Sequence, residues 1–337
     1  MENINEWKEK LLSDGIISED EVKIIRELLF KDGIIDREEV DFLLDLNAAT
    51  RYSHNDPTWY DLLVESILLH LNVIDTQKNK INTLNEHITA SIKYAKRIQN
   101  AIMPNKEEID SILSEYFILF KPKDIVSGDF YWINKIDNKI FVVVADCTGH
   151  GVPGAFMSML GISLLNIIVK ENFKFTPGEI LNRLRESVMV MLSQTSKKAE
   201  SKDGMDISFC TIDLNTKKLQ FAGAYNSLYL IRKGDLIELK ADRMPIGIHV
   251  SEMKAFTNHE VDIMKDDMVY MFSDGYASQF GGANGLKFMT TNLVKILINI
   301  ANEDVSNQTK TLEQHLTEWQ GECPQVDDIL VLGFKVP

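Results

Sequence analysis

The sequence predicts an α+β protein, in which an all-helical N-terminal region precedes a layered sandwich of β-sheets and helices. Beyond Ser111 the helical periodicity gives way to short runs rich in β-branched and aromatic residues, separated by turns. Hairpin-like turns such as 137–138 and 233–235 join several of these runs and indicate antiparallel sheets. The helical patterns cluster between and after the strands, which favours a layered sandwich over a doubly wound sheet.

Residues 1–70 are expected to form a helical regulatory or sensor domain with an internal repeat. Asp14–Val22 and Asp32–Val40 share a glycine turn, an apolar pair and then Ser18 or Asp36 with glutamate three residues later, which is a helix start with a capping box. An EF-hand is disfavoured, because the first carboxylates of a calcium loop are missing. The region is weakly similar to small TerB-type helical domains.

Residues 71–108 are interpreted as a linker whose helix runs from about Leu71 to Ile102 and ends before Pro104. Its apolar positions recur at spacings of three and four, so one stripe on a polar helix must be covered. Packing within the same domain is one explanation. The other, which we favour, is a parallel two-helix seam that forms a homodimer, with register set by the polar interruptions Lys78, Asn85 and Gln99.

The remaining residues, 109–337, form the predicted sandwich domain. The expected strands are 116–120, 130–133, 140–145, 207–212, 219–222, 228–231, 268–272 and 329–334. The expected helices are 153–170, 177–194 and 290–319.

Composition excludes several classes of protein. The chain has 337 residues and a net charge of −14, so it offers no basic surface for a nucleic acid backbone. Three widely spaced cysteines indicate reduced thiols in a cytoplasmic protein, and the polar, acidic N-terminus lacks a secretory signal. The apolar stretch Val152–Val169 is interrupted by polar residues and is interpreted as a buried core helix, so no membrane association is expected.

Four aspartates lie in short, turn-rich motifs at the edges of predicted strands. They are Asp129, Asp146, Asp274 and Asp327. An aspartate beside a buried strand and next to glycine can hold a hard divalent cation, although each one alone is more often a turn or capping residue. Four together predict a carboxylate-lined site, and two metal ions are favoured over one.

The motifs resemble those of the SpoIIE branch of the bacterial metal-dependent serine/threonine phosphatases, the PPM superfamily. The resemblance rests on Val126–Trp132, Asp146–Ala155, Phe221–Leu230, Phe272–Tyr276 and Val326–Ile329, and it covers about residues 109–337. It implies an αββα layered β-sandwich, two Mn²⁺ or Mg²⁺ ions, and hydrolysis of phosphoserine or phosphothreonine on a partner protein. By family analogy that partner is an anti-sigma-antagonist (STAS-like) protein, and the helix before residue 109 resembles the linker that switches this branch.

The resemblance also implies a role for each site residue. Asp146 would bridge both metals, and the Cys147 backbone carbonyl would bind one of them. Asp274 and Asp327 would complete the other site, and Asp129 would hold a metal or its water. Asp146 and Asp129 are therefore also the predicted catalytic residues, and no nucleophilic side chain is needed.

The chain departs from the family pattern at several positions. Cys147 stands where glycine is usual. Thr148 stands where more distant members of the superfamily often place a histidine acid, so that water is left to protonate the leaving group. We interpret His150 as loop packing. Asp206 is a weak candidate for an outer metal and is more simply explained as a turn residue at the start of a strand. Leu330 replaces a common threonine.

Two other functions use the same residues. The first is a catalytically silent interaction module that keeps the PPM fold, and an intact set of carboxylates argues against it. The second is a metal-dependent phosphodiesterase acting on nucleotides, which the acidic composition and the lack of a base-stacking motif disfavour.

Overall fold

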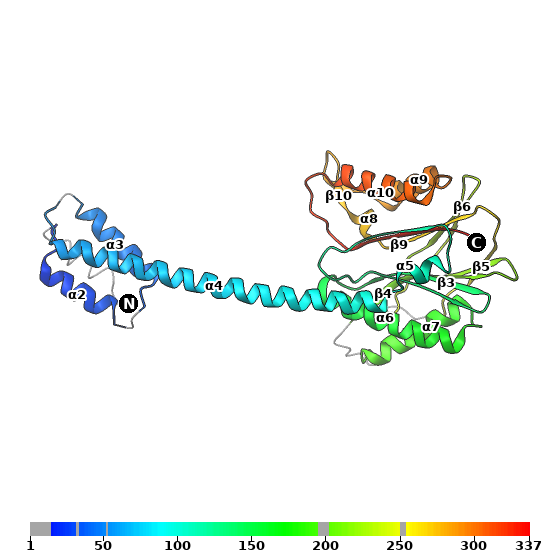
Figure 1. The fold of residues 1–337 in the computed structure, drawn as a ribbon, viewed down its shortest axis with the longest axis horizontal. Coiled ribbons are helices and arrows are strands. Elements are labelled where there is room, and N and C mark those ends of the chain that lie inside the picture. Colours follow the sequence, from blue (N-terminus) through cyan, green and yellow to red (C-terminus); the bar gives the residue numbers. More distant parts are fainter. Residues whose placement is uncertain (1–14, 32–33, 52, 195–201, 250–253) are drawn as a thin grey trace. The chain divides into compact units, whose positions relative to one another are not determined.

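The computed structural model describes residues 15–31, 34–51, 53–194, 202–249 and 254–337 (Figure 1). The chain divides into two compact units, Met1–Ala90 and Ser91–Pro337. Three positions of the predicted repeat, Asp14, Asp32 and Gly33, lie outside the described residues.

The N-terminal unit is helical, as the sequence predicts. Helix α2 (Glu19–Leu29) starts at Ser18, α3 (Arg37–Ala49) starts at Asp36, and both starts carry a complete capping box. Their apolar faces pack with the first turns of α4 (Pro57–Ile102) around the fully buried side chain of Trp59. The repeat is therefore two capped helices that share one small core.

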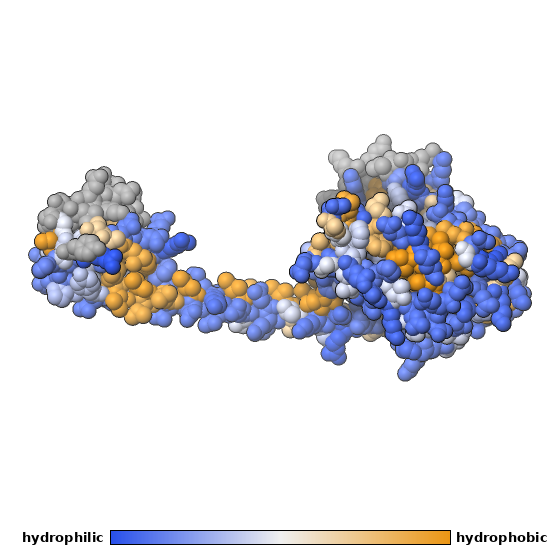
Figure 2. Space-filling view, turned by 90° about the horizontal axis from the view of Figure 1, so that it is seen from above, coloured by the Kyte–Doolittle hydropathy of each residue, from blue (hydrophilic) through white to orange (hydrophobic). Residues whose placement is uncertain are grey.

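Helix α4 is longer than predicted, since it begins at Pro57 and runs unbroken to Ile102. Pro57 is well placed at the first position of a helix, where its missing N–H costs no hydrogen bond. The middle of α4 exposes a stripe of apolar side chains, visible as orange patches on a mostly blue helix in Figure 2. These side chains are Leu71, Ile74, Ile81, Leu84 and Ile88. The predicted boundaries at residues 70 and 108 fall within α4 and α5.

Two five-stranded antiparallel sheets form the C-terminal unit. The strand order of the first is β1-β12-β9-β6-β7 and that of the second is β2-β3-β4-β5-β8. The first sheet comprises β1 (Tyr116–Lys121), β12 (Ile329–Lys335), β9 (Met268–Phe272), β6 (Leu228–Arg232) and β7 (Asp235–Leu239). The second comprises β2 (Phe130–Ile136), β3 (Lys139–Cys147), β4 (Met205–Asp213), β5 (Lys218–Ala224) and β8 (His259–Asp262).

Helices cover the outer faces of both sheets, and the inner faces pack on each other. Helices α6 (Gly151–Asn172) and α7 (Pro177–Met191) share a core with the β2–β3–β4 face, and α9 (Thr290–Ile300) and α10 (Val305–Gln320) share one with the β12–β9 face. A separate apolar core joins the two sheets, and the short helix α5 (Lys106–Asp110) contributes to it. The order is helix, sheet, sheet, helix, which confirms the predicted layered α+β sandwich.

Three details differ from the sequence prediction. The helix expected over 290–319 is two helices, because both Ile300 and Leu312 are buried in the same core and the chain must turn between them. The short strands β7 and β8 were not predicted, since each is only four or five residues long and contains two acidic residues. A further small hairpin, β10 (Phe280–Gly281) with β11 (Leu286–Lys287), was also missed.

Among the described residues, α6 alone is long and apolar enough to span a membrane by length and composition. More than half of its apolar window is buried inside the protein, against the sheet that contains β2 and β3. The helix is therefore accounted for as the core helix that the sequence predicts.

Candidate functional site

Four aspartates from different parts of the chain line one pocket of about 250 Å³ at the end of the sandwich. They are Asp146, Asp206, Asp274 and Asp327. Three of them were predicted as metal ligands. The rest of the lining comes mainly from the loop after β3 and from the start of β4, together with Lys202 and Pro245. The sandwich therefore gathers residues that are up to 181 positions apart.

Asp146 and Asp206 lie opposite each other on neighbouring strands. Asp146 is near the end of the buried strand β3, and its Cα partner across the antiparallel ladder is Asp206 of β4. Burial, followed by the charges of nearby carboxylates, raises the pKa of Asp146 to about 8. The same two causes raise the pKa of Asp206 to about 7. Asp206 is thus a strand residue that faces the pocket, and its interpretation as a turn residue was wrong.

Asp274 and Asp327 complete the pocket from the other sheet. Asp274 follows β9 and starts the short helix α8 (Gly275–Ser278), and its backbone N–H donates to the Asp146 carboxylate at 3.5 Å. Gly275 is required here, since an added Cβ would lie 1.9 Å from the Asp328 carbonyl oxygen. The glycine after Asp274 therefore lets the end of β9 approach the start of β12.

Asp129 is buried, with 2% of its surface exposed. The Ser273 hydroxyl donates to its carboxylate at 2.5 Å. Burial, and then the Asp146 carboxylate, raise the pKa of Asp129 well above its ordinary value. The structure therefore places Asp129 within electrostatic reach of Asp146, although it does not line the pocket.

Asp328 has a different role from its neighbour Asp327. One of its carboxylate oxygens accepts the backbone N–H of Lys123 and the other accepts that of Gly128, both at 2.7 Å. A buried carboxylate with two backbone donors is satisfied without a cation. Asp328 therefore ties the start of β12 to the segment before Asp129.

The loop after Asp146 is fixed by backbone contacts. Thr148 exchanges hydrogen bonds with Gly204 through its backbone N–H and its hydroxyl. An added Cβ on Gly128 would lie 2.4 Å from the Gly149 carbonyl oxygen and 3.3 Å from that of Cys147. The Cys147 side chain is buried in the core, so its presence in place of glycine leaves the backbone carbonyl available at the pocket.

His150 lines the pocket and makes polar contacts, which differ from the loop packing predicted. Its Nδ1 lies 2.6 Å from an Asp124 carboxylate oxygen, and its Nε2 lies 2.9 Å from the Lys123 ammonium nitrogen. An Nδ1–H that donates to Asp124 leaves Nε2 to accept from Lys123. The three side chains form a polar rim next to the carboxylates.

The donor set fits a divalent cation. All four pocket aspartates offer oxygen ligands, which Mg²⁺ and Mn²⁺ prefer. At Asp146 and Asp206, burial and the charges of nearby carboxylates disfavour ionisation unless a positive charge is present. In the described part of the chain, no three acidic, histidine or cysteine side chains already converge closely enough to hold an ion. The residues therefore have the right chemistry, and their side chains must close further around any bound metal.

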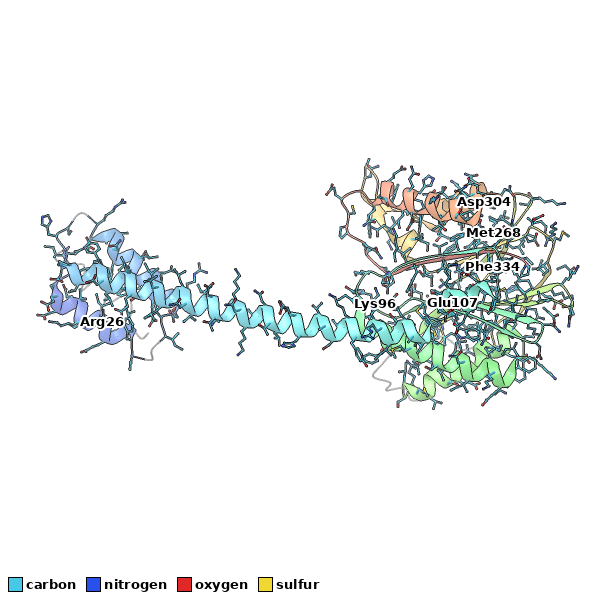
Figure 3. All side chains as sticks on the ribbon, in the orientation of Figure 1. Arg26, Lys96, Glu107, Met268, Asp304 and Phe334 are labelled. Carbon is cyan, nitrogen blue, oxygen red and sulfur yellow. The ribbon has the colours of Figure 1, made fainter. Side chains whose placement is uncertain are left out.

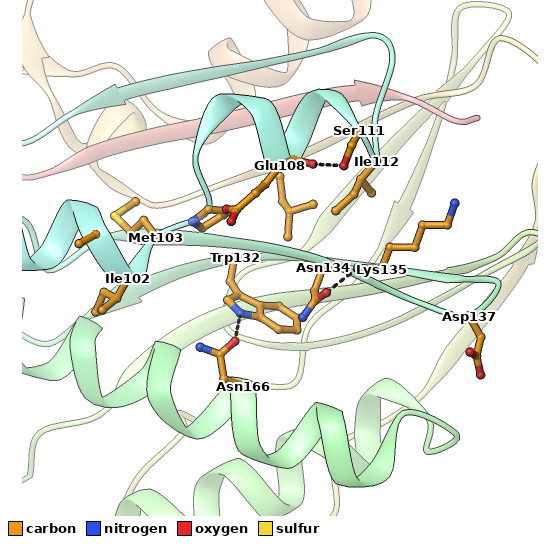
Figure 4. Close-up of a pocket in the computed structure, with 13 residues that line it drawn as sticks. Ile102, Met103, Glu108, Ser111, Ile112, Trp132, Asn134, Lys135, Asp137 and Asn166 are labelled. Carbon is orange, nitrogen blue, oxygen red and sulfur yellow. Dashed lines mark hydrogen bonds between the residues drawn. The ribbon is translucent and has the colours of Figure 1, made fainter.

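A larger pocket, of about 620 Å³, lies elsewhere in the C-terminal unit and contains none of these aspartates (Figure 4). It is bounded by the end of α4, by α5, by β2 and by α6. The Trp132 indole N–H donates to the Asn166 side chain in its wall at 2.9 Å. Size alone would favour this pocket, but the smaller one carries the reactive groups, and we assign the chemistry there.

Comparison with known proteins agrees with this geometry. The family model described as "Stage II sporulation protein E (SpoIIE)" matches residues 136–337, more than half of the chain. The protein belongs to the SpoIIE family. It is similar to the SiaA-PP2C domain of Pseudomonas aeruginosa, with 34% identity and a TM-score of 0.68 over 75% of this chain and 99% of that chain.

Two further relatives are more distant. The phosphoserine phosphatase RsbU of Bacillus subtilis is 24% identical over 222 residues, which are 64% of this chain and 61% of RsbU. The match thus spans about three-fifths of that relative's length. The structure of the PP2C phosphatase domain of SpoIIE from Bacillus subtilis shares the fold, with 16% identity and a TM-score of 0.53 over 66% of this chain and 63% of that chain. The PPM fold predicted from the motifs is confirmed.

Proposed function

We propose that this SpoIIE-family protein is a Mn²⁺- or Mg²⁺-dependent protein phosphatase that hydrolyses phosphoserine or phosphothreonine on a partner protein. The proposal depends mainly on the pocket, which is lined by Asp146, Asp206, Asp274 and Asp327. The pKa values of Asp146 and Asp206 are raised. Several carboxylates that face one another in a partly buried pocket are typical of a cation site. Relatives named as phosphatases support the reaction class.

Each residue has a defined part in the proposed reaction. Asp146, Asp274, Asp327 and the Cys147 backbone carbonyl would hold the cations, with Asp206 as a further oxygen ligand and Asp129 within electrostatic reach of Asp146. Two divalent cations, when bound, lower the pKa of a nearby water and neutralise charge on the phosphoryl group. Thr148 and Gly204 hold the loop so that the Cys147 carbonyl keeps its direction.

The partner and the regulation belong to the same proposal. We propose that the substrate is a phosphorylated anti-sigma-antagonist (STAS-like) protein, and that the N-terminal helices control activity through the linker. The exposed stripe of α4 supports a homodimer formed by that helix, since apolar residues at heptad-like spacing are typical of a two-helix seam. A cytoplasmic location fits the reduced cysteines, and the acidic composition gives no support to a nucleic acid partner.

A catalytically silent module is the second candidate. The observation in its favour is that no described set of three side chains is close enough to bind an ion. Against it, a silent fold would gain stability by replacing Asp146 and Asp206 with neutral residues, since burial and repulsion disfavour their charges.

The test is an assay of the full chain on a phosphoseryl protein with and without Mn²⁺. We expect turnover that requires metal and is lost on chelation with EDTA. A cyclic dinucleotide assayed in parallel should not be hydrolysed. Metal-independent turnover, or none at millimolar Mn²⁺, would contradict the proposal.

A further inference from the structure

The side chain of Gln99 is buried near the C-terminal end of α4, where the helix belongs to the C-terminal unit. Gln99 is 3% exposed, whereas its neighbours Ile98 and Asn100 are exposed. Lys96, labelled in Figure 3, marks these last turns. The sequence suggested that Gln99 sets register in a dimer seam. The structure instead turns its carboxamide into its own domain, so that interpretation was wrong.

The Gln99 carboxamide makes hydrogen bonds to both backbone groups of one residue, Ser127. Its Nε2 donates to the Ser127 carbonyl oxygen at 2.6 Å and to the Ser158 hydroxyl at 2.8 Å. Its Oε1 accepts the Ser127 backbone N–H at 3.2 Å. Ser158, on α6, also donates to the Ser127 carbonyl oxygen. Gln99 thus satisfies both backbone groups of Ser127 in the interior.

Hydrogen bonds connect Ser127 and the next residue to the aspartates of the site. Its hydroxyl accepts the Asp129 backbone N–H at 3.1 Å, and the next residue, Gly128, donates to Asp328. Gly128 also packs against the carbonyl oxygens of Cys147 and Gly149, as the positions of an added Cβ show. A displacement of Ser127 would therefore move Asp129 and the loop after Asp146 together.

We infer that Gln99 is a positioning residue for the metal site, and that it links the last turns of α4 to Asp129 and to the Cys147 carbonyl. The inference rests on the proposed function and names one residue through which the linker helix would act. A rotation of these helix turns would take the carboxamide away from Ser127. Residues that orient metal ligands typically alter metal affinity about 10- to 100-fold when they are replaced.

The experiment compares three variants of the full chain. Gln99→Met keeps the length and the helix preference of the side chain but removes all of its hydrogen bonds. Gln99→Glu keeps the acceptor for the Ser127 N–H and loses the donors. Asn100→Leu is the matched control, because it replaces an exposed amide on the next helix position. The readouts are amide hydrogen exchange at residues 127–129 without metal, the Mn²⁺ concentration for half-maximal activity, and thermal stability.

We expect Gln99→Met to exchange faster at residues 127–129 and to need about tenfold more Mn²⁺. Gln99→Glu should be intermediate and Asn100→Leu unchanged. If a folded Gln99→Met protein shows the hydrogen exchange and the Mn²⁺ dependence of the wild type, the inference is overturned. It is also overturned if the only change is a loss of thermal stability. If Gln99→Met does not fold, the same two readouts on Gln99→Glu decide. Absence of activity in the wild type would overturn the proposed function, while hydrogen exchange would still test the role of Gln99.

Discussion

The aspartates at the end of the sandwich fall into two groups that differ in what surrounds their carboxylates. Asp146 and Asp206 face the pocket, and their pKa values are raised to about 8 and about 7 by burial and by neighbouring acids. Asp328, one residue from the pocket-lining Asp327, is more buried but receives two backbone N–H groups from the protein itself. Burial alone therefore does not mark a ligand.

The difference in hydrogen-bond donors shows which carboxylates need a cation to stabilise their negative charge. A carboxylate with strong donors from the protein is stable as an anion and has a structural function. A partly buried carboxylate facing other carboxylates is stable only when it is protonated or next to a cation. Replacement of a pocket acid should therefore stabilise the metal-free protein, whereas replacement of Asp328 should destabilise it.

The largest effect is expected at the pocket. Asp146→Asn should reduce phosphatase activity about a thousandfold, because a metal contributes several kcal/mol to the transition state. The same change should raise the melting temperature of the metal-free protein at neutral pH, since a neutral Asn avoids the proton uptake that Asp146 needs on folding. Kinetic assays and calorimetry measure the two effects. Asp235→Asn, on the exposed strand β7, is the control and should change neither.

Asp328→Ala should lower the stability of the metal-free protein, which is the opposite of the effect expected at the pocket. Its removal leaves the backbone N–H groups of Lys123 and Gly128 without their acceptor, at a cost of about 2–4 kcal/mol in the free energy of unfolding. Denaturant titration of the metal-free protein measures that loss. Asp328→Asn retains an acceptor oxygen and should lose less. Unchanged stability in Asp328→Ala would show that the assignment of a structural role is mistaken.

The pH dependence of stability tests the pocket acids without mutation. The folded, metal-free protein keeps protons on Asp146 and Asp206 up to about pH 8 and pH 7, whereas the unfolded chain releases them near pH 4. The folded state binds more protons between these limits, so stability should fall as pH rises from about 4 to 8. Thermal melts from pH 5 to 8 test this, and Asp146→Asn should flatten the profile.

The smallest effect on the site is expected from a change in the exposed stripe of α4. Ile81→Glu should weaken self-association, because a charge in a two-helix seam cannot be covered by the partner helix. Analytical ultracentrifugation measures the change, and Mn²⁺ binding at the pocket should stay the same. Asn82→Glu adds the same charge at the neighbouring exposed position and serves as the control. If the dimer forms through another surface, Ile81→Glu will associate as strongly as the wild type.

The sequence predicted those parts of the site that depend on local pattern. The sequence singled out Asp146 and Asp274, which both line the pocket, because each comes after an apolar run and before a glycine-containing turn. Asp206 was misjudged, since only the register of β3 with β4 shows that it faces Asp146. The role of Asp328 depends on donors about 200 positions away, which no local pattern reveals.

The same limit explains the other differences. Gln99 interrupts an apolar stripe in the sequence, and only the packing of α4 against Ser127 and Ser158 shows that it is buried. The layered order of sheets and helices was predictable, because the β-rich runs are joined by hairpin-like turns and the helical patterns cluster between and after them. The break between α9 and α10 was not, since it is imposed by the core that both helices share.

Manganese binding at the pocket tests the central claim most directly. Crystals of the full chain soaked in Mn²⁺ should give anomalous diffraction peaks between Asp146, Asp274 and Asp327, and crystals of Asp146→Asn should lose at least one of them. An ordered pocket without a manganese peak, in crystals of protein that retains phosphatase activity, would contradict the account.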